Sequence, residues 1–179
     1  TEEEKCQNAI TQITDAIRGH FGSDVSVIRQ GSHRNRTNTR SDSDVDIAVV
    51  HENYFFPDIG GLSESDKIIY NRSAIKADYM FSDFKNDVQN VLIKSLGSGY
   101  IERKNKCIRI KGNSYRINAD VVPAYGHKRF SSPDKAEAEG VSVNPVLTVP
   151  QTAGEFLRQP PVLGFIIVLM IATFAIMLL

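Results

Sequence analysis

Two carboxylates at the start of an apolar strand most constrain what this chain can fold into. Asp44 precedes a run of mostly β-branched residues, 45–50, and Asp46 lies within it; this run predicts a buried strand. Strand side chains alternate between two faces, so both carboxylates point one way and Val45 and Ile47 point into the core. Carboxylates in such a place are costly unless something positive lies between them. The fold must supply that positive partner.

A second stretch of the chain repeats this alternation. Residues 115–122 predict a strand whose polar face carries Arg116, Asn118 and Asp120. If both strands share one sheet, Asp120 joins Asp44 and Asp46 on its polar face. Oxygen ligands without cysteine or histidine select Mg²⁺ or Mn²⁺ rather than zinc. The sequence therefore predicts a metal site with three aspartate ligands.

A Gly-Ser pair adds a candidate site for an anion. Gly31 ends an expected strand, and Ser32 begins a polar stretch, 33–41, that predicts a helical turn. Backbone N–H groups and a hydroxyl are exposed to a phosphate in such a turn. A phosphate beside two metal ions is the layout of two-metal phosphoryl transfer. Arg40 is a candidate to steer a triphosphate, with an ordinary surface arginine as the alternative.

The order and spacing of these motifs resemble a known superfamily. A Gly-Ser pair, eleven residues, then Asp-Val-Asp and Ile is similar to the signature of polymerase-β-like nucleotidyltransferases. More narrowly, "QGSHRNRTNTRSDSDVDIAVV" (30–50) and "ADVVPAY" (119–125) resemble the bacterial CD-NTases. These are relatives of cyclic GMP-AMP synthase and oligoadenylate synthase, and they make cyclic di- or oligonucleotide signals in antiphage defence.

The resemblance implies a function and a role for each site residue. It implies a Mg²⁺-dependent nucleotidyltransferase that uses NTPs and two metal ions, with Mn²⁺ as a substitute. Gly31 and Ser32 would hold the donor triphosphate. Asp44 and Asp46 would bind both metals, and Asp120 would complete the site for the acceptor 3′-hydroxyl. The fold it implies is a twisted mixed sheet backed by helices.

The patterns along the chain agree with an α+β fold of this kind. Apolar residues at three- and four-residue spacing predict helices over 2–21 and 73–96, ended by Gly22 and Gly97. The expected strands are 25–28, 45–50, 100–103, 107–111 and 115–122, with 51–72 as loop containing a little helix. The predicted organisation is a nucleotidyltransferase core over 1–130, a proline-rich linker over 131–160 and an apolar tail over 161–179.

The apolar tail predicts a membrane anchor. Residues 162–179 contain no charge, and as a helix they would span about 27 Å, close to a hydrocarbon core of roughly 30 Å. Arg158 just before them would place the rest of the chain on the cytoplasmic side. A very apolar core helix or a truncated or frame-disturbed end are the alternatives. Complete CD-NTases instead continue into a helical lobe that closes over the nucleotide.

The composition limits which partners and which cellular compartment we expect. Lys+Arg and Asp+Glu balance at 21 each, which argues against binding to long nucleic acid. The only cysteines, Cys6 and Cys107, have no metal-binding spacing and read as small core residues of a cytoplasmic protein. The expected location is the cytoplasm, with the tail as an anchor to the inner face of the plasma membrane. The oligomeric state is not predicted.

Three functions fit these residues. The leading hypothesis is a signal-nucleotide synthase acting on NTPs. A small nucleotidyltransferase that modifies a protein, an RNA end or an antibiotic hydroxyl would need the same site. A truncated, membrane-tethered remnant that binds nucleotide without turnover is the third. Product analysis separates the first two, because only a synthase turns NTPs alone into a new nucleotide.

Overall fold

The computed structural model describes residues 1–30, 44–142 and 151–152. Its helices are α1 (Glu2–Phe21), α3 (Glu64–Ser73) and α4 (Phe81–Leu96), with short 3₁₀ helices η1 (Gly22–Asp24) and η2 (Ser98–Tyr100). Its strands are β1 (Val25–Gln30), β2 (Val45–Asp58), β3 (Ile101–Arg103), β4 (Ile108–Ile110), β5 (Ala119–Ser132), β6 (Lys135–Ser142) and β7 (Gln151–Thr152). The predicted α+β class, with a mixed sheet and helices, is confirmed.

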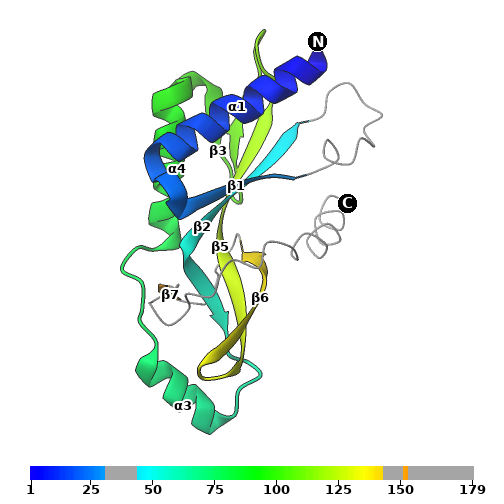
Figure 1. Ribbon diagram of the computed structural model, residues 1–179. Coiled ribbons are helices and arrows are strands. Elements are labelled where there is room, and N and C mark those ends of the chain that lie inside the picture. Colours follow the sequence, from blue (N-terminus) through cyan, green and yellow to red (C-terminus); the bar gives the residue numbers. More distant parts are fainter. Residues whose placement is uncertain (31–43, 143–150, 153–179) are drawn as a thin grey trace.

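One mixed sheet organises the described residues. Its strand order is β1-β2-β5-β4-β3, with β6 added to β5 and β7 added to β2. The central strands β2 and β5 are parallel, and every other pair is antiparallel. Figure 1 shows β2 and β5 running from the end covered by α1 and α4 to a distal end formed by β6 and α3.

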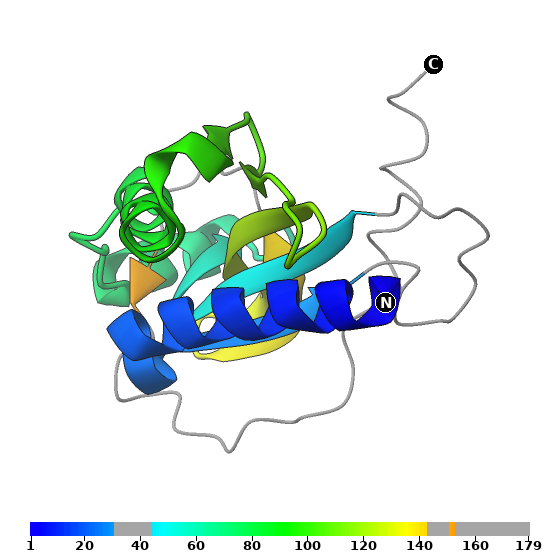
Figure 2. The same ribbon diagram turned by 90° about the horizontal axis from the view of Figure 1, so that it is seen from above.

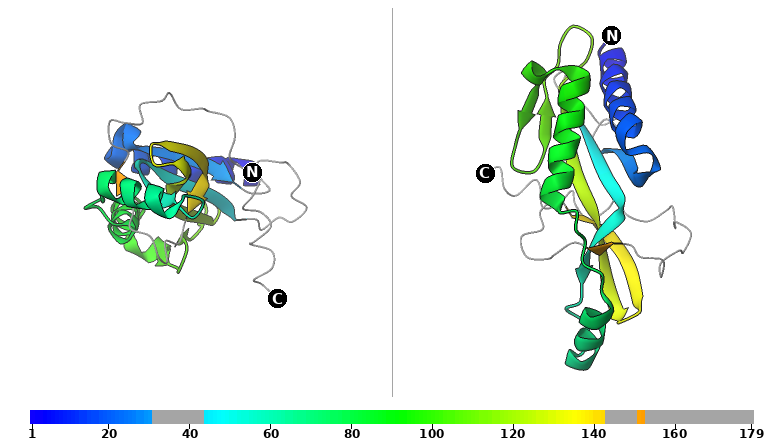
Figure 3. Two further views of the ribbon diagram at one scale, coloured as in Figure 1. Left: turned by 90° about the horizontal axis from the view of Figure 1, so that it is seen from below. Right: turned by 90° about the vertical axis from the view of Figure 1, so that its left-hand side faces the viewer.

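Helix α1 forms where its sequence predicts. The Thr1 hydroxyl accepts from the Glu4 backbone N–H, the Glu4 side chain completes a capping box, and Gly22 ends the helix at φ 60°. One stripe of the helix is buried, comprising Cys6, Ala9, Ile13 and Ile17. In Figure 2 this helix runs alongside β1 and β2, and in Figure 3 (right) it lies beside α4. The predicted helix over 2–21 is therefore confirmed.

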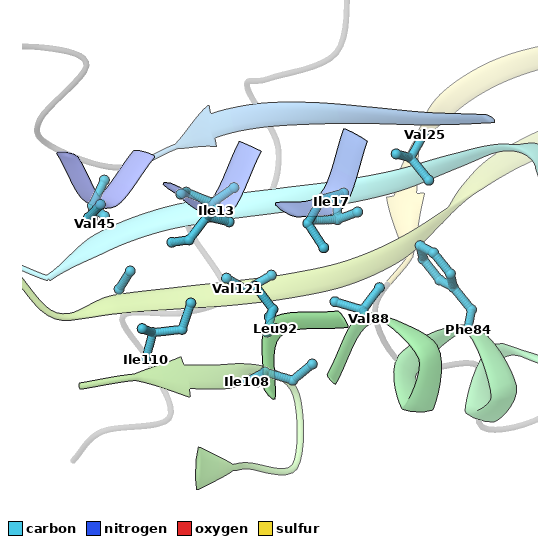
Figure 4. Packing of buried hydrophobic residues seen from close by; sticks show 14 of the residues in the cluster. Ile13, Ile17, Val25, Val45, Phe84, Val88, Leu92, Ile108, Ile110 and Val121 are labelled. Carbon is cyan, nitrogen blue, oxygen red and sulfur yellow. The ribbon is translucent and has the colours of Figure 1, made fainter. Parts of the chain in front are cut away.

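The main core lies between the sheet and these two helices. Figure 4 shows Ile13 and Ile17 from α1, and Phe84, Val88 and Leu92 from α4, packed over strand residues that include Val45, Ile108 and Val121. All eight side chains are fully buried. Since each strand turns its apolar side chains toward the helices, its alternate side chains lie on the opposite face. Packing on one face thus fixes the direction of the polar residues on the other.

Strand β2 is longer than predicted. The sequence favours a strand over 45–50 and a loop after it, whereas β2 continues to Asp58. The pairing with β5 is irregular between His51 and Phe55 and then resumes. Pro57 is tolerated because, among the described strands, only β5 pairs with β2 at this point, so no partner needs its missing N–H. The irregularity is what breaks the apolar alternation in the sequence.

Helix α4 is shorter than predicted. The sequence indicates a helix over 73–96, but α3 ends at Ser73 and α4 begins only at Phe81. At the start of α4 the Met80 backbone N–H donates to the Asp83 carboxylate at 3.1 Å. This bond to a nearby side chain satisfies the Met80 N–H, which in a longer helix would bond to a backbone carbonyl of the preceding turn. The predicted end at Gly97 is confirmed, with φ 92°.

Strand β5 begins later and ends later than predicted. Residues 115–118 form a turn and coil instead of the expected start of the strand. Their predicted faces are reversed, because Tyr115 is 53% exposed and Arg116 is 4% exposed. The Arg116 guanidinium packs on the Tyr100 ring and donates to Gln12 at 3.1 Å. The strand then runs through Pro123 to Ser132.

The sheet extends into the region predicted as linker. Strand β6 pairs antiparallel with residues 125–132 of β5, and β7 pairs with β2. A second apolar cluster at this distal end contains Phe55, Leu62, Tyr70 and Phe130. Residues 135–142 are therefore a strand where the proline content indicated a linker, while the proposed boundary between a core and a tail stays a prediction.

Several predicted features fall outside the described residues. These are the helical turn at 33–41 and the apolar tail at 161–179. Within 1–30, 44–142 and 151–152, none of the helices has the length and apolar character needed to cross a membrane. The membrane tether through 162–179 stays a prediction.

Candidate active site

A row of polar residues crosses four neighbouring strands. Asp120 in β5 pairs with Asp46 in the parallel strand β2 and with Arg109 in the antiparallel strand β4. On the far side of β2, Asp46 pairs with Gln30 in β1. Directly opposed residues in a sheet point to the same face, with neighbouring strands about 4.8 Å apart. The strand register thus brings Asp46 and Asp120 together, as the sequence predicts.

Asp44 reaches the same row from just before β2. One of its carboxylate oxygens, Oδ2, accepts from the Arg109 guanidinium Nη2 at 2.7 Å. About a third of each side chain is exposed, at 34% for Arg109 and 29% for Asp44. The ion pair spans β5, because Arg109 belongs to β4 and Asp44 leads into β2. For Asp44, the positive partner that the sequence requires is Arg109 in this structure.

The surroundings of Asp120 disfavour its ionised form. Burial raises its pKa and the nearby Asp44 carboxylate raises it further, while Arg109 and a hydrogen bond with Cys107 lower it, with a net upward shift. Its Oδ1 atom is buried without a hydrogen-bond partner in the described residues. An ionised oxygen held in this way is stabilised by a cation.

A tight turn positions the start of β5 against β2. The Asn118 carbonyl accepts from the Val45 backbone N–H at 3.1 Å, which joins the two strands at the level of Asp44. The Asn118 side chain in turn accepts from the Gly112 N–H at 2.8 Å. A Cβ at Gly112 would lie 2.9 Å from the Asn118 backbone nitrogen, so only glycine fits. Asn118 therefore holds the turn.

Comparisons with known proteins identify homologues of the chain. No family model matches the chain. It is 50% identical over 141 residues to a cyclic dipurine nucleotide synthase of Elizabethkingia meningoseptica, covering 79% of this chain and 48% of the relative. A solved structure of the Elizabethkingia meningoseptica CdnE cyclic dinucleotide synthase, with GTP and Apcpp, is 42% identical, with a TM-score of 0.57 over 79% of this chain and 45% of that one. Over this matched region the chain is a homologue of the CD-NTases.

Other CD-NTases agree with this assignment. A cyclic GMP-AMP synthase, CdnE03, of Staphylococcus schleiferi is 32% identical in an alignment of 160 residues that covers 74% of this chain and 48% of the relative. The Rhodothermus marinus CdnE c-UMP-AMP synthase structure shares the fold, with a TM-score of 0.58 at 24% identity over 76% of this chain and 50% of that one. The chain thus spans about half the length of the CD-NTases it matches.

The donor set of this site suits a hard divalent cation. Asp44, Asp46 and Asp120 offer carboxylate oxygens, and Asp120 Oδ1 is buried without a partner. As they stand, the described residues contain no group of three potential ligands arranged to hold a metal ion. The carboxylate of Asp44 is engaged with Arg109 instead. The residues therefore fit a metal chemically, and Asp44 would exchange one positive partner for another.

The predicted phosphate contacts lie outside the described residues. Gly31, Ser32 and Arg40 all fall in the stretch 31–43, so their roles stay predictions. The described chain on either side does fix where that stretch begins and ends. Gln30 and Asp46 are paired residues of β1 and β2, and the stretch joins those two strands at the level of the polar row.

Two residues of the site were missed at the sequence level. The sequence motifs do not point to Arg109, and they predict Cys107 as a core residue, yet both lie beside Asp120. The signal was present, because Cys107 and Arg109 alternate with the apolar Ile108 and Ile110 in the expected strand 107–111. A buried Lys85 ammonium supports this hairpin by donating to the carbonyls of Lys104 and Asn105, at 2.9 and 2.6 Å.

Proposed function

We propose that this chain carries the nucleotidyltransferase half of an enzyme that makes a cyclic di- or oligonucleotide from NTPs. The observation that carries the proposal is the pairing of Asp46 with Asp120 across β2 and β5, with Asp44 beside them. Three carboxylates on one sheet face would be unfavourable without a cation, whereas the reaction needs two metal ions there. Homology to the CD-NTases supports the same reaction.

Asp44, Asp46 and Asp120 are the residues we propose as metal ligands. Bound Mg²⁺ or Mn²⁺ would lower the pKa of the attacking hydroxyl and neutralise charge on the transferred phosphoryl group. Asp44 just before β2 and Asp46 within it would serve the donor side. Asp120 comes from another strand and would serve the acceptor side. In the proposed site, Gly31 and Ser32 bind the donor triphosphate and Arg40 steers it.

The similarity to the Elizabethkingia protein supports purine NTPs as substrates. That relative is a cyclic dipurine nucleotide synthase, and its solved structure contains GTP and Apcpp. A cyclic dipyrimidine nucleotide synthase of Legionella pneumophila is also similar, at 36% identity over 152 residues. The higher identity to the dipurine enzyme favours ATP and GTP here. The role in antiphage defence that the resemblance implies depends on such a product.

A product assay tests this function. The protein is incubated with ATP, GTP, CTP and UTP, singly and in pairs, with Mg²⁺ or Mn²⁺, and products are treated with phosphatase and separated by chromatography. A phosphatase-resistant nucleotide formed from purine NTPs alone is the expected result. Transfer that occurs only after a protein, RNA or antibiotic is added would favour a modifying enzyme. Binding of NTP without any transfer would favour a remnant without turnover.

The phosphate contact gives a separate prediction. Ser32→Ala should weaken NTP binding by about 1–3 kcal/mol, the loss expected for a hydrogen bond to a charged group. Calorimetric titration with a non-hydrolysable ATP analogue measures it, with Ser23→Ala, in η1, as the matched control. If the unmodified protein bound ATP and adenosine with equal affinity, the triphosphate would have no such contact.

A further inference from the structure

Arg109 lies at the β4 end of the polar row, beside the acidic residues. It pairs with Asp120 across the β4–β5 ladder and forms a 2.7 Å ion pair with Asp44. It is one of the influences that lower the pKa of Asp120. The guanidinium thus acts on two of the three carboxylates that we propose as metal ligands.

The position of Arg109 has a consequence for cation binding. A guanidinium stays charged under all ordinary conditions, so Arg109 cannot be neutralised by losing a proton. A divalent cation bound by Asp44 must therefore displace the guanidinium from that carboxylate or bind beside a positive charge. Either route lowers the affinity for the cation, since like charges a few ångströms apart repel at a partly buried site.

We propose that Arg109 is a positioning residue that holds Asp44 in place of a cation and sets the concentration at which a divalent cation enters. This inference rests on the proposed metal site and goes beyond it by assigning the competitor. Without a divalent cation, Arg109 offsets the repulsion between Asp44 and Asp120. It thereby keeps β2 and β5 in register. When a cation arrives, Asp44 leaves Arg109 and becomes a ligand.

Metal binding and thermal unfolding test this inference without an activity assay. Mn²⁺ binding is measured by electron paramagnetic resonance, in the absence of nucleotide, for the unmodified protein, Arg109→Gln and Arg109→Lys. Arg109→Gln should bind Mn²⁺ about tenfold more tightly, because a competing charge is gone. Without metal it should melt at a lower temperature, and saturating Mn²⁺ should raise its melting temperature by more than that of the unmodified protein. Arg109→Lys, which keeps the charge, should stay within about twofold of the unmodified affinity.

Two further variants separate this inference from the proposed function. Arg129→Gln removes another arginine, in β5, whose Nε lies 3.3 Å from the Asp58 carboxylate. This variant should leave the affinity for Mn²⁺ unchanged. Asp46→Asn should lose Mn²⁺ binding, and its failure to do so would place the metal elsewhere and overturn the proposed site. If Asp46→Asn loses binding but Arg109→Gln binds Mn²⁺ equally or more weakly, only the role of Arg109 is wrong. If neither the unmodified protein nor Arg109→Gln binds Mn²⁺, both the proposed metal site and the proposed role of Arg109 are wrong.

Discussion

Asp46→Asn and Asp120→Asn should each reduce formation of the nucleotide product by at least about a thousandfold. Asparagine keeps the shape of aspartate but removes the charge, and several kcal/mol of transition-state stabilisation depend on that charge. The two variants should differ in binding. Asp46→Asn should also weaken binding of the metal-bound NTP, and so should Asp44→Asn, whereas Asp120→Asn should leave donor binding intact.

Calorimetry with a non-hydrolysable ATP analogue and Mg²⁺, beside the product assay, measures both effects. Asp15→Asn, on the exposed side of α1, is the matched control and should leave product formation unchanged. Turnover of NTPs at the normal rate by Asp120→Asn would remove this carboxylate from the site, and the two-metal interpretation with it.

Asp120→Asn should also raise the melting temperature of the metal-free protein at neutral pH. Burial raises the pKa of Asp120, so its ionised form is less favourable in the folded chain than in the unfolded one. The raised pKa means that the ionised carboxylate lowers stability at neutral pH, and this cost disappears below the ordinary pKa of 3.8. Thermal unfolding at pH 7.5 and at pH 3.5 should therefore show a difference that shrinks in acid.

Phe84→Ala should lower the free energy of unfolding by about 3–5 kcal/mol, as expected for truncating a fully buried aromatic ring. Phe84, in α4, is 0% exposed and belongs to an aromatic group contributed by α1, the segment before α4 and the sheet. Its ring centroid is 5.1 to 6.4 Å from those of four other rings, belonging to Phe21, His51, Tyr79 and Tyr125. The surrounding strands restrict collapse into the space that the ring leaves.

Urea unfolding followed by circular dichroism measures this loss. Tyr115→Ala removes an aromatic ring of similar size that is 53% exposed, and should change stability by no more than about 0.5 kcal/mol. A loss below about 1 kcal/mol for Phe84→Ala would mean that this aromatic group does not pack as described.

Patterns within short stretches of the sequence predicted the elements whose ends and buried faces depend on neighbouring residues in the chain. Helix α1 has a capping box, an apolar stripe and a terminal glycine, and each is visible within a few residues of sequence. The start of β2 and the placing of Asp44 and Asp46 follow from simple alternation. The resemblance to CD-NTases, carried by the same short motifs, predicted the fold class correctly.

Features that depend on distant partners were not predictable in this way. Pro123 ended the expected pattern, yet β5 continues through it, because its partner β4 pairs only up to Val121 and β6 begins pairing at Tyr125. The role of Arg109 depends on the register of β4 against β5, and a one-residue shift would turn its side chain to the other face. Long-range register of this kind has no short-range signature.

The irregular pairing between β2 and β5 has a consequence for how the protein can vary. His51 is paired with Tyr125 and Phe55 with Gly126, so three residues of β2 between them have no counterpart in β5. The distal end with β6 and α3 therefore has a register of its own. Insertions or deletions beyond His51 can lengthen or shorten that end while Asp46 stays opposite Asp120. The site and the distal end can thus diverge independently among descendants of this sequence.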